Sequence, residues 1–172
     1  MAFTPNGTLS PFGAPVLKSQ ILANSITVTT NDSVKAASGF VTLGTAGVLV
    51  LGHVQSIVTN KGVGLNTTGV AGAEMGSFVN TYLTASNNQT VGFVRAMCDV
   101  SKETLYSAEV SAAIGTTTGS NLLGYFMDLT DEDTLNEGSA ATTTCQYFNW
   151  GVDPLNTAQA LVNVYESLVF GV

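Results

Sequence analysis

The feature that most limits the fold of this chain is a succession of short β-branched segments separated by turn residues. Segments rich in Val, Ile, Thr, Phe and Tyr recur along the chain, and clusters of Gly, Asn, Ser and Asp lie between them. No stretch carries the long 3.6-residue apolar period of an amphipathic helix. Short strands with regular turn signals are typical of sandwiches and barrels. We therefore predict an all-β, mainly antiparallel fold with a sandwich or barrel-like single core and long loops.

Nine segments carry this strand pattern, and helix is expected only as two single turns. The expected strands lie at residues 25–30, 34–43, 48–58, 78–85, 89–100, 104–110, 122–129, 142–150 and 158–170. One turn is expected at Thr130–Asp133, which matches a capping box, and one after Asp153, where Pro154 takes the first helical position. The glycine-rich stretch 60–77 is expected to be a surface loop, and no tandem repeat is detectable.

The first twenty residues differ in composition from the rest of the chain. They hold three of the four prolines, and isolated apolar residues lie between them, among them Phe3, Leu9, Phe12 and Leu17. Proline removes a backbone donor, which argues against a central strand. We therefore divide the chain into an extended N-terminal arm, residues 1–20, and a β domain, residues 21–172. A flexible terminus and an arm packed on its own domain are the alternatives.

Length and charge narrow the class of protein. A chain of 172 residues can bury a core without a disulfide or a metal ion. Only 10% of its residues are charged, against about 25% in an average soluble domain. Five Lys and Arg oppose twelve Asp and Glu, and the cations form no run, which disfavours nucleic acid and anionic membranes as partners. With so few charged side chains, little on the surface disfavours contact with other proteins. We therefore expect the protein to self-associate and to bind partner proteins.

The residues needed for catalysis are scarce. His53 is the single histidine, it lies in a strand-like segment, and no G-x-S-x-G motif accompanies it. The segment 62–69 lacks the Lys-Ser/Thr of a phosphate-binding P-loop. Cys98 and Cys145 are expected to be reduced and buried, and with one histidine they cannot complete a zinc site without carboxylates. We predict that the protein is not an enzyme and binds no cofactor or metal.

Acidic residues gather between Asp128 and Glu137, and two interpretations of this stretch stay open. Oxygen ligands at such a density could hold calcium. However, Leu135 and Asn136 occupy positions where an EF-hand loop needs a ligand and a glycine. A solvated acidic loop that keeps a weakly charged protein soluble is the favoured interpretation.

Three long segments of the chain resemble the capsid decoration (cement) proteins of tailed bacteriophages. They are VKAASGFVTLGTAGVLVLGHVQSIV (34–58), LYSAEVSAAIGTTTGSNLLGYFMDL (105–129) and QYFNWGVDPLNTAQALVNVYESLVF (146–170). The resemblance implies a homotrimer that binds the major capsid protein on the outer surface of the head and stabilises the shell. It implies no catalytic residues, and a location on the virion after synthesis in the host cytoplasm. The N-terminus has no signal-peptide pattern, and no apolar run approaches the ~20 residues of a transmembrane helix.

Arms often make the contacts between subunits in such proteins, so the apolar residues of the arm become candidates for partner binding. With the single tryptophan, the set is Phe3, Leu9, Phe12, Leu17 and Trp150. Two other functions remain open. One is another phage structural component, such as a tail-tube or fibre subunit. The other is a carbohydrate-binding module that stacks sugars on Trp150 and on Tyr147 or Tyr165.

Overall fold

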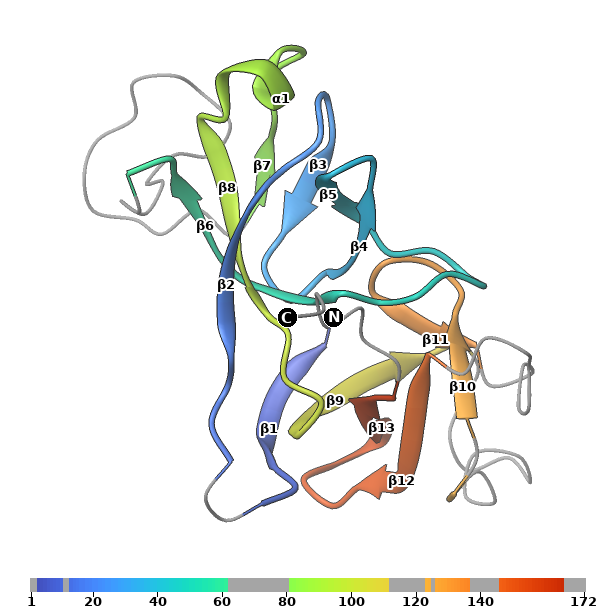
Figure 1. Ribbon diagram of the computed structural model, residues 1–172. Coiled ribbons are helices and arrows are strands. Elements are labelled where there is room, and N and C mark those ends of the chain that lie inside the picture. The colour runs from blue at the N-terminus through green and yellow to red at the C-terminus, as the bar shows by residue number, and fades with distance from the viewer. Residues whose placement is uncertain are drawn as a thin grey trace.

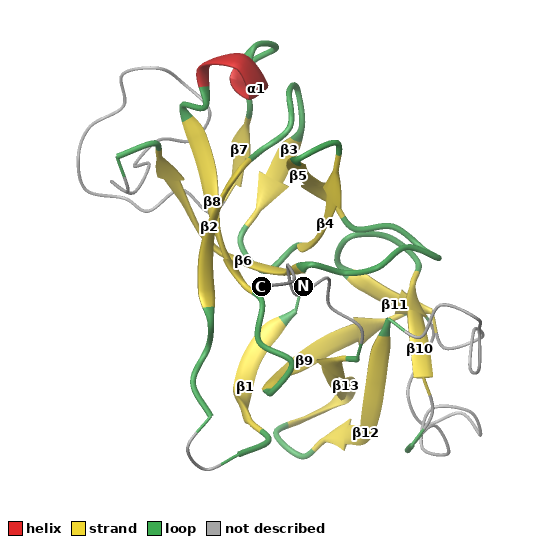
Figure 2. Cartoon of the chain, viewed as in Figure 1, coloured by secondary structure: helices red, strands yellow, loops and turns green. Residues whose placement is uncertain are grey.

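A computed structural model gives the structure of the chain and describes residues 3–10, 13–61, 81–111, 123–124, 126–136 and 146–165. Of these residues, 59% lie in β-strands and 3% in helix, which confirms the all-β prediction (Figures 1 and 2). The elements are β1 (Thr4–Thr8), β2 (Leu17–Ile21), β3 (Thr27–Thr29), β4 (Ser33–Ala37), β5 (Phe40–Leu43), β6 (Gly52–Thr59), β7 (Thr81–Leu83), α1 (Asn88–Val91), β8 (Val94–Asp99), β9 (Thr104–Val110), β10 (Phe126–Leu129), β11 (Thr134–Asn136), β12 (Tyr147–Asp153) and β13 (Asn156–Val164).

The first half of the chain forms a small barrel, here called the N-terminal barrel. Its five strands pair antiparallel in the order β2-β8-β6-β4-β5. A parallel bridge between Leu22 and Val41 joins the two ends of this order, and the amide of Ala23 donates to the carbonyl of Val41 at 2.8 Å. A separate ribbon of β3 and β7 packs Val28 and Tyr82 against the interior of this barrel.

The second half forms a C-terminal barrel with the same topology. β9 pairs with β13, β13 with β12, β12 with β10, and β10 with β11, all antiparallel, and β11 returns to β9 in parallel. Taken in chain order, the five strands of each barrel make the same pairings, and the parallel pair closes each ring. β2, β4, β5, β6 and β8 thus correspond to β9, β10, β11, β12 and β13. Figure 1 shows the N-terminal barrel above the C-terminal one.

The described residues of the expected arm, 3–10 and 13–20, are not separate from the β domain, so the predicted boundary at residue 20 is corrected. β1 pairs antiparallel with β9 of the C-terminal barrel, and β2 pairs antiparallel with β8 of the N-terminal barrel. Proline is accommodated because β1 is an edge strand whose ladder is irregular between Pro5 and Gly7. The alternative of a segment packed on its own domain agrees with the structure.

Two hydrophobic clusters fill the barrels and meet in one continuous interior. Inward-facing residues of β9 to β13 form one cluster, and those of β2 to β8 form the other. Phe3 and Val50 belong to the C-terminal cluster although both precede that barrel in the chain. His53 of β6 links the clusters, since its ring lies 4.0 Å from that of Tyr106, measured between centroids.

Small residues allow the tight turns and close contacts of the N-terminal barrel. Ser38 and Gly39 both have positive φ angles, 50° and 83°, and connect β4 to β5 in a two-residue hairpin. The sequence pattern joined these two strands in one segment. A Cβ atom on Gly52 would lie 2.0 Å from the carbonyl oxygen of Asp99, so only glycine lets β6 lie this close to β8.

The two predicted helical turns are absent at their sites. Residues 130–133 connect β10 to β11 in a hairpin, and residues 154–155 connect β12 to β13. Among the described residues, the one short helix, α1, overlaps the start of the expected strand 89–100. It is held by Asn88, whose buried amide donates to the carbonyls of Leu22 and Val94 and accepts from the amide of Val94.

Candidate functional site

The outer face of the C-terminal barrel carries a row of aromatic side chains. Alternation along a strand sends neighbouring residues to opposite faces. Tyr147 of β12 therefore points into the core, whereas its neighbour Phe148 points outward. The outward residues form an aromatic strip, defined as Phe126, Phe148, Trp150 and Tyr165. Ring centroids are 5.6 Å apart for Phe126 and Phe148, 4.4 Å for Phe126 and Tyr165, and 4.8 Å for Phe148 and Trp150.

Two rings of the strip are exposed to solvent, and a hydrogen bond holds one of them in place. Trp150 is 44% exposed and Tyr165 is 46% exposed. The indole N–H of Trp150 donates to Oδ1 of Asn163 at 2.8 Å, and the Asn163 amide donates to the carbonyl of Lys102 at 2.8 Å. A fixed aromatic side chain loses little conformational freedom when it is covered, which suits a contact surface.

The N-terminal barrel provides an internal comparison for this strip. β4, β6 and β8 correspond to β10, β12 and β13, yet they contain no Phe, Tyr or Trp. Their half-buried positions carry a mixture of polar and apolar side chains without an aromatic ring: Lys35, Ala36, Gln55, Ser56, Thr59, Arg95 and Met97. The shared topology therefore does not require aromatic rings on the outer face. Cross-strand pairing, as between Phe126 and Phe148, stabilises the sheet, and the exposed rings of the strip are in addition available for contact with another molecule.

His53 is a structural residue at the junction of the barrels. Its ring is fully buried, and the ring of Phe3 lies 4.5 Å away. Nε2 lies 3.0 Å from the hydroxyl of Tyr147, which also donates to Oγ of Ser33 at 2.9 Å. Because the Tyr147 hydroxyl donates its proton to Ser33, Nε2 of His53 must donate to the Tyr147 oxygen. Nδ1 is then an acceptor, and it is buried without a hydrogen-bond partner. Burial lowers the pKa of His53 to about 3, so the ring is neutral. Because the ring is also fully buried, a substrate in solution cannot contact it, as a general base would require.

A buried carboxylate fixes the connection between the barrels. Asp99, at the end of β8, is 1% exposed. Its Oδ1 accepts from the amides of Ser101 and Val16, and its Oδ2 accepts from the hydroxyls of Thr104 and Tyr106. Four donors compensate the desolvation of this charge. Asp99 thus ties the start of β2 and the start of β9 to the linker.

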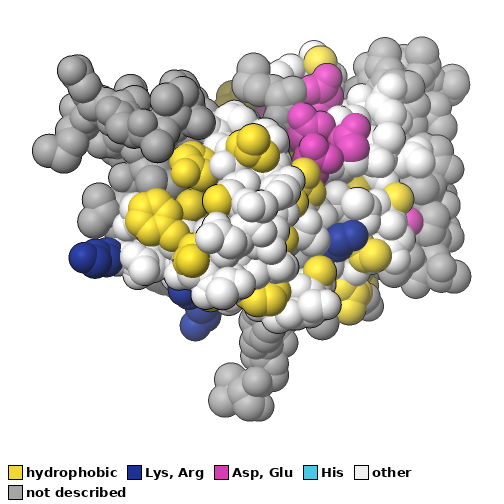
Figure 3. Space-filling view, turned by 90° about the horizontal axis from the view of Figure 1, so that it is seen from above, with side chains coloured by type: hydrophobic (Ala, Val, Ile, Leu, Met, Phe, Trp, Pro, Cys, Tyr) yellow, Lys and Arg dark blue, Asp and Glu magenta, His cyan; other side chains and the backbone are white. Residues whose placement is uncertain are grey.

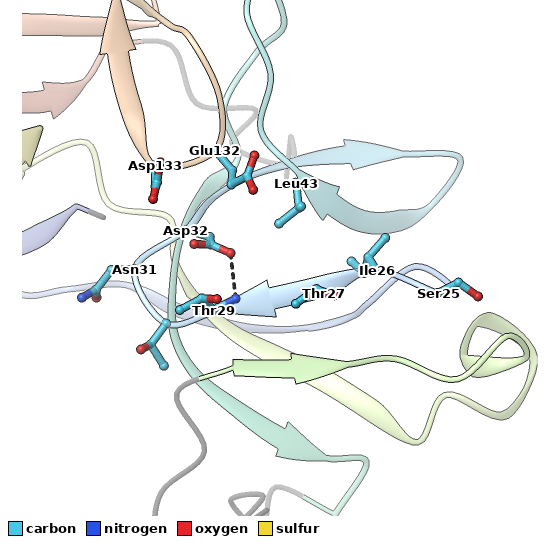
Figure 4. Close-up of a pocket in the computed structure, with 10 residues that line it drawn as sticks. Ser25, Ile26, Thr27, Thr29, Asn31, Asp32, Leu43, Glu132 and Asp133 are labelled. Carbon is cyan, nitrogen blue, oxygen red and sulfur yellow. Dashed lines mark hydrogen bonds between the residues drawn. The ribbon is translucent and has the colours of Figure 1, made fainter. Parts of the chain in front are cut away.

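Acidic side chains gather around a pocket of about 700 Å³ between the barrels (Figure 4). Asp32 lies after β3, while Glu132 and Asp133 come from the hairpin between β10 and β11. The Ser33 amide donates to the carbonyl of Glu132 at 2.7 Å, and the Thr29 amide donates to Asp32 at 2.7 Å. Burial, reinforced by the charges of Glu132 and Asp133, raises the pKa of Asp32 to about 7.

The acidic residues described around this pocket do not form a metal-binding group. Among the described residues, no group of three or more His, Cys, Asp or Glu side chains is arranged to hold a metal ion. Figure 3 shows the main group of acidic side chains on a face that also carries a few separate Lys and Arg side chains. Within the described part of residues 128–137, Asp128 is buried in β10, whereas Asp131 is exposed and Glu132 and Asp133 are half-buried in the hairpin.

The predicted partner-binding residues do not form one surface. Phe3 is fully buried in its own chain and stacks on Tyr147 at 5.0 Å, so its assignment as an exposed anchor is wrong. Leu9 is 42% exposed and Leu17 is 48% exposed. Phe12 lies outside the described residues. Trp150 is exposed, but it belongs to the C-terminal barrel and not to the N-terminal segment.

Two further predictions concern the cysteines and the tyrosines that were expected to stack on sugars. Cys98 is a free, buried thiol, and burial together with the charge of Asp99 raises its pKa to about 12. Cys145 lies outside the described residues. Tyr147, expected as one stacking platform for sugars, is fully buried, whereas Tyr165 lies in the strip.

Sequence reasoning named Trp150 and Tyr165 but missed Phe126 and Phe148, and it did not predict that the four rings lie together. Phe148 and Trp150 alternate with Tyr147 and Asn149, a period-two signal that could have placed both on the outer face. The contributions of Phe126 and Tyr165 depend on the pairing of β10 and β13 with β12, which no local pattern fixes.

Comparisons with known proteins give no identification: no family model, no curated protein and no solved structure matches the chain. Among the described residues, no helix is long and apolar enough to cross a membrane.

Proposed function

We propose that the protein is a non-enzymatic structural component of a tailed-phage virion. It binds the major capsid protein on the outer surface of the head and stabilises the shell. The observation that carries this proposal is the aromatic strip, because the corresponding strands of the N-terminal barrel contain no aromatic ring. An exposed, anchored tryptophan beside three other aromatic rings is typical of a protein-binding hot spot.

The rest of the molecule is compatible with this role. His53 supports the junction of the barrels from a buried position and is not directed at a substrate. The low content of charged residues suits a surface that is largely covered by other subunits. A homotrimer bound to the capsid would cover several such surfaces at once, and symmetry would add avidity to individually weak contacts.

The test is binding to purified heads that lack the protein. We expect Trp150→Ala to weaken binding at least tenfold, since truncating an aromatic hot spot costs about 2 kcal/mol or more. Leu155→Ala is the matched control, because Leu155 is 85% exposed on the turn before β13, away from the strip. Equal binding of the two variants would argue against the strip as the capsid contact.

A carbohydrate-binding function is the second candidate, favoured by the exposure of Trp150 and Tyr165 on one face. Sugar rings stack on exposed aromatic side chains. A glycan array separates the two functions: binding of a defined glycan that Trp150→Ala abolishes, with no binding to heads, would favour the carbohydrate module.

A further inference from the structure

The two barrels differ at one edge. In the C-terminal barrel, β9 pairs with β13 along one edge, and two strands share its other edge. β11 runs parallel to Glu109 and Val110, and β1 runs antiparallel to residues 104–107. Tyr106 and Ser107 pair with both β1 and β13, so β1 and β13 must lie on opposite edges of β9.

The corresponding edge of β2 is paired with another strand at one end only. β5 bridges it at Leu22, as β11 does on β9. Within the part of the chain that the structure describes, no strand pairs with this edge along Leu17–Gln20, where β1 would lie on β9. Leu17 is 48% exposed, and Figure 1 shows β2 along the left border of the molecule.

The backbone of β2 is oriented for strand addition. The amide of Leu22 donates to the carbonyl of Val94 on β8, and the amide of Ala23 donates to Val41 on β5. Successive residues of an antiparallel strand direct their backbone groups alternately to the two edges. Leu17 therefore presents its N–H and C=O groups on the outer edge, away from β8, and Ser19 presents its N–H group there; the carbonyl of Ser19 accepts from Arg95.

Positive charge marks the same edge. Lys18 is exposed, and the guanidinium of Arg95 donates from Nε to Oγ of Ser19 at 2.8 Å and from Nη2 to the carbonyl of Ser19 at 3.1 Å. These are two of five cations in a chain with twelve acidic residues. Antiparallel pairing of β2 with β2 of a second copy would bring these cations toward their own counterparts, which disfavours self-pairing.

We propose that the outer edge of β2, residues 17–20, is a strand-addition site for an extended, acidic segment of a partner protein. The segment binds antiparallel to β2, as β1 binds β9. The N–H and C=O groups of Leu17 and the N–H group of Ser19 form hydrogen bonds with its backbone, and its carboxylates lie near Lys18 and Arg95. This site is distinct from the aromatic strip and does not depend on the proposed capsid role.

The test is a peptide titration of the full chain, followed through its backbone amides by NMR. The probe is the acetylated, amidated hexapeptide Thr-Glu-Thr-Val-Glu-Thr at millimolar concentration, and its counterpart carries Lys in place of both Glu residues. We expect the acidic peptide to shift the amides of Leu17 and Ser19 and to slow their hydrogen exchange. The counterpart should bind at least fivefold more weakly, and added salt should reduce the difference.

Variants of β2 separate strand addition from other modes of binding. Ser19→Pro removes an outward N–H, which an edge strand tolerates, and should abolish binding. Ser19→Thr keeps both that N–H and a hydroxyl that can accept from Arg95, and is the matched control. If Ser19→Pro does not fold, the double variant Lys18→Gln, Arg95→Gln gives the second readout, since both peptides should then bind equally.

Three results would overturn the proposal. The first is that neither amide responds to the acidic peptide. The second is that the lysine counterpart binds the wild-type chain as well as the acidic peptide does. The third is sedimentation that shows a wild-type dimer and a Ser19→Pro monomer, because a second copy would then occupy the edge.

Discussion

Replacing Phe3 by alanine tests whether the N-terminal segment is part of the folded core. The side chain of Phe3 has no exposed surface, and its ring contacts three others, those of His53, Tyr106 and Tyr147. The variant leaves a cavity at the junction of the two barrels. It also removes the ring that anchors the start of β1 beside β9.

The expected cost follows from this burial. Truncating a fully buried phenylalanine typically lowers the free energy of unfolding by about 3–5 kcal/mol. That is a large share of the roughly 5–15 kcal/mol that stabilises an average protein. With a urea m-value of about 2–3 kcal/mol/M, the midpoint of unfolding should fall by roughly 1–2 M. Water entering the cavity should also raise the pKa of His53 from about 3 toward its ordinary value of 6.5.

The assay is urea unfolding followed by circular dichroism, with an NMR titration of the His53 ring. Leu9→Ala is the control, because Leu9 is 42% exposed and its truncation should change the free energy of unfolding by less than about 1 kcal/mol. An unchanged midpoint for Phe3→Ala, with no change in the His53 titration, would show that residues 1–8 are a detachable arm. The position of Phe3 in the core would then be refuted.

Three further predictions concern stability and its pH dependence. Gly52→Ala places a Cβ atom against the Asp99 carbonyl and should cost about 1–3 kcal/mol or more in urea unfolding; a wild-type midpoint would contradict the close approach of β6 and β8. His53 should make the protein less stable as the pH falls from 6.5 to about 3, because the unfolded chain binds a proton that the folded one excludes. Asp32 acts in the opposite direction, since its folded pKa of about 7 keeps a proton that the unfolded chain releases above about pH 4. In the Asp32→Asn variant this opposing contribution is lost. As the pH falls from 6.5 to 4.5, the free energy of unfolding of the variant should therefore fall more steeply than that of the wild type, by up to about 1.4 kcal/mol per pH unit. Parallel pH profiles for the variant and the wild type would disprove this assignment.

The fold class follows from local patterns, whereas the arrangement of the strands does not. Alternating β-branched residues predicted the segment 104–110, which is β9. The same patterns missed β1 and β2, because prolines and isolated apolar residues in a terminal segment look like an arm until a partner strand is known. The turn at Ser38 and Gly39 was also missed, because Ser-Gly within a β-branched run is a weak break.

The shared topology of the barrels was invisible in the sequence. β4 reads SVKAA where β10 reads FMDL, and β6 reads GHVQSIVT where β12 reads YFNWGVD. Strand pairing depends on the alternation of buried and exposed positions more than on residue identity. The aromatic strip and the open edge of β2 both follow from that pairing, which explains why Trp150 and Tyr165 were named from the sequence but their place in one strip with Phe126 and Phe148 was not predicted.

The most direct test of the proposed function is electron cryomicroscopy of heads mixed with the purified protein. The account predicts density for the two barrels on the outer face of the shell, with Phe148 and Trp150 against the major capsid protein. Heads without added density, or bound protein with the aromatic strip facing solvent, would contradict it.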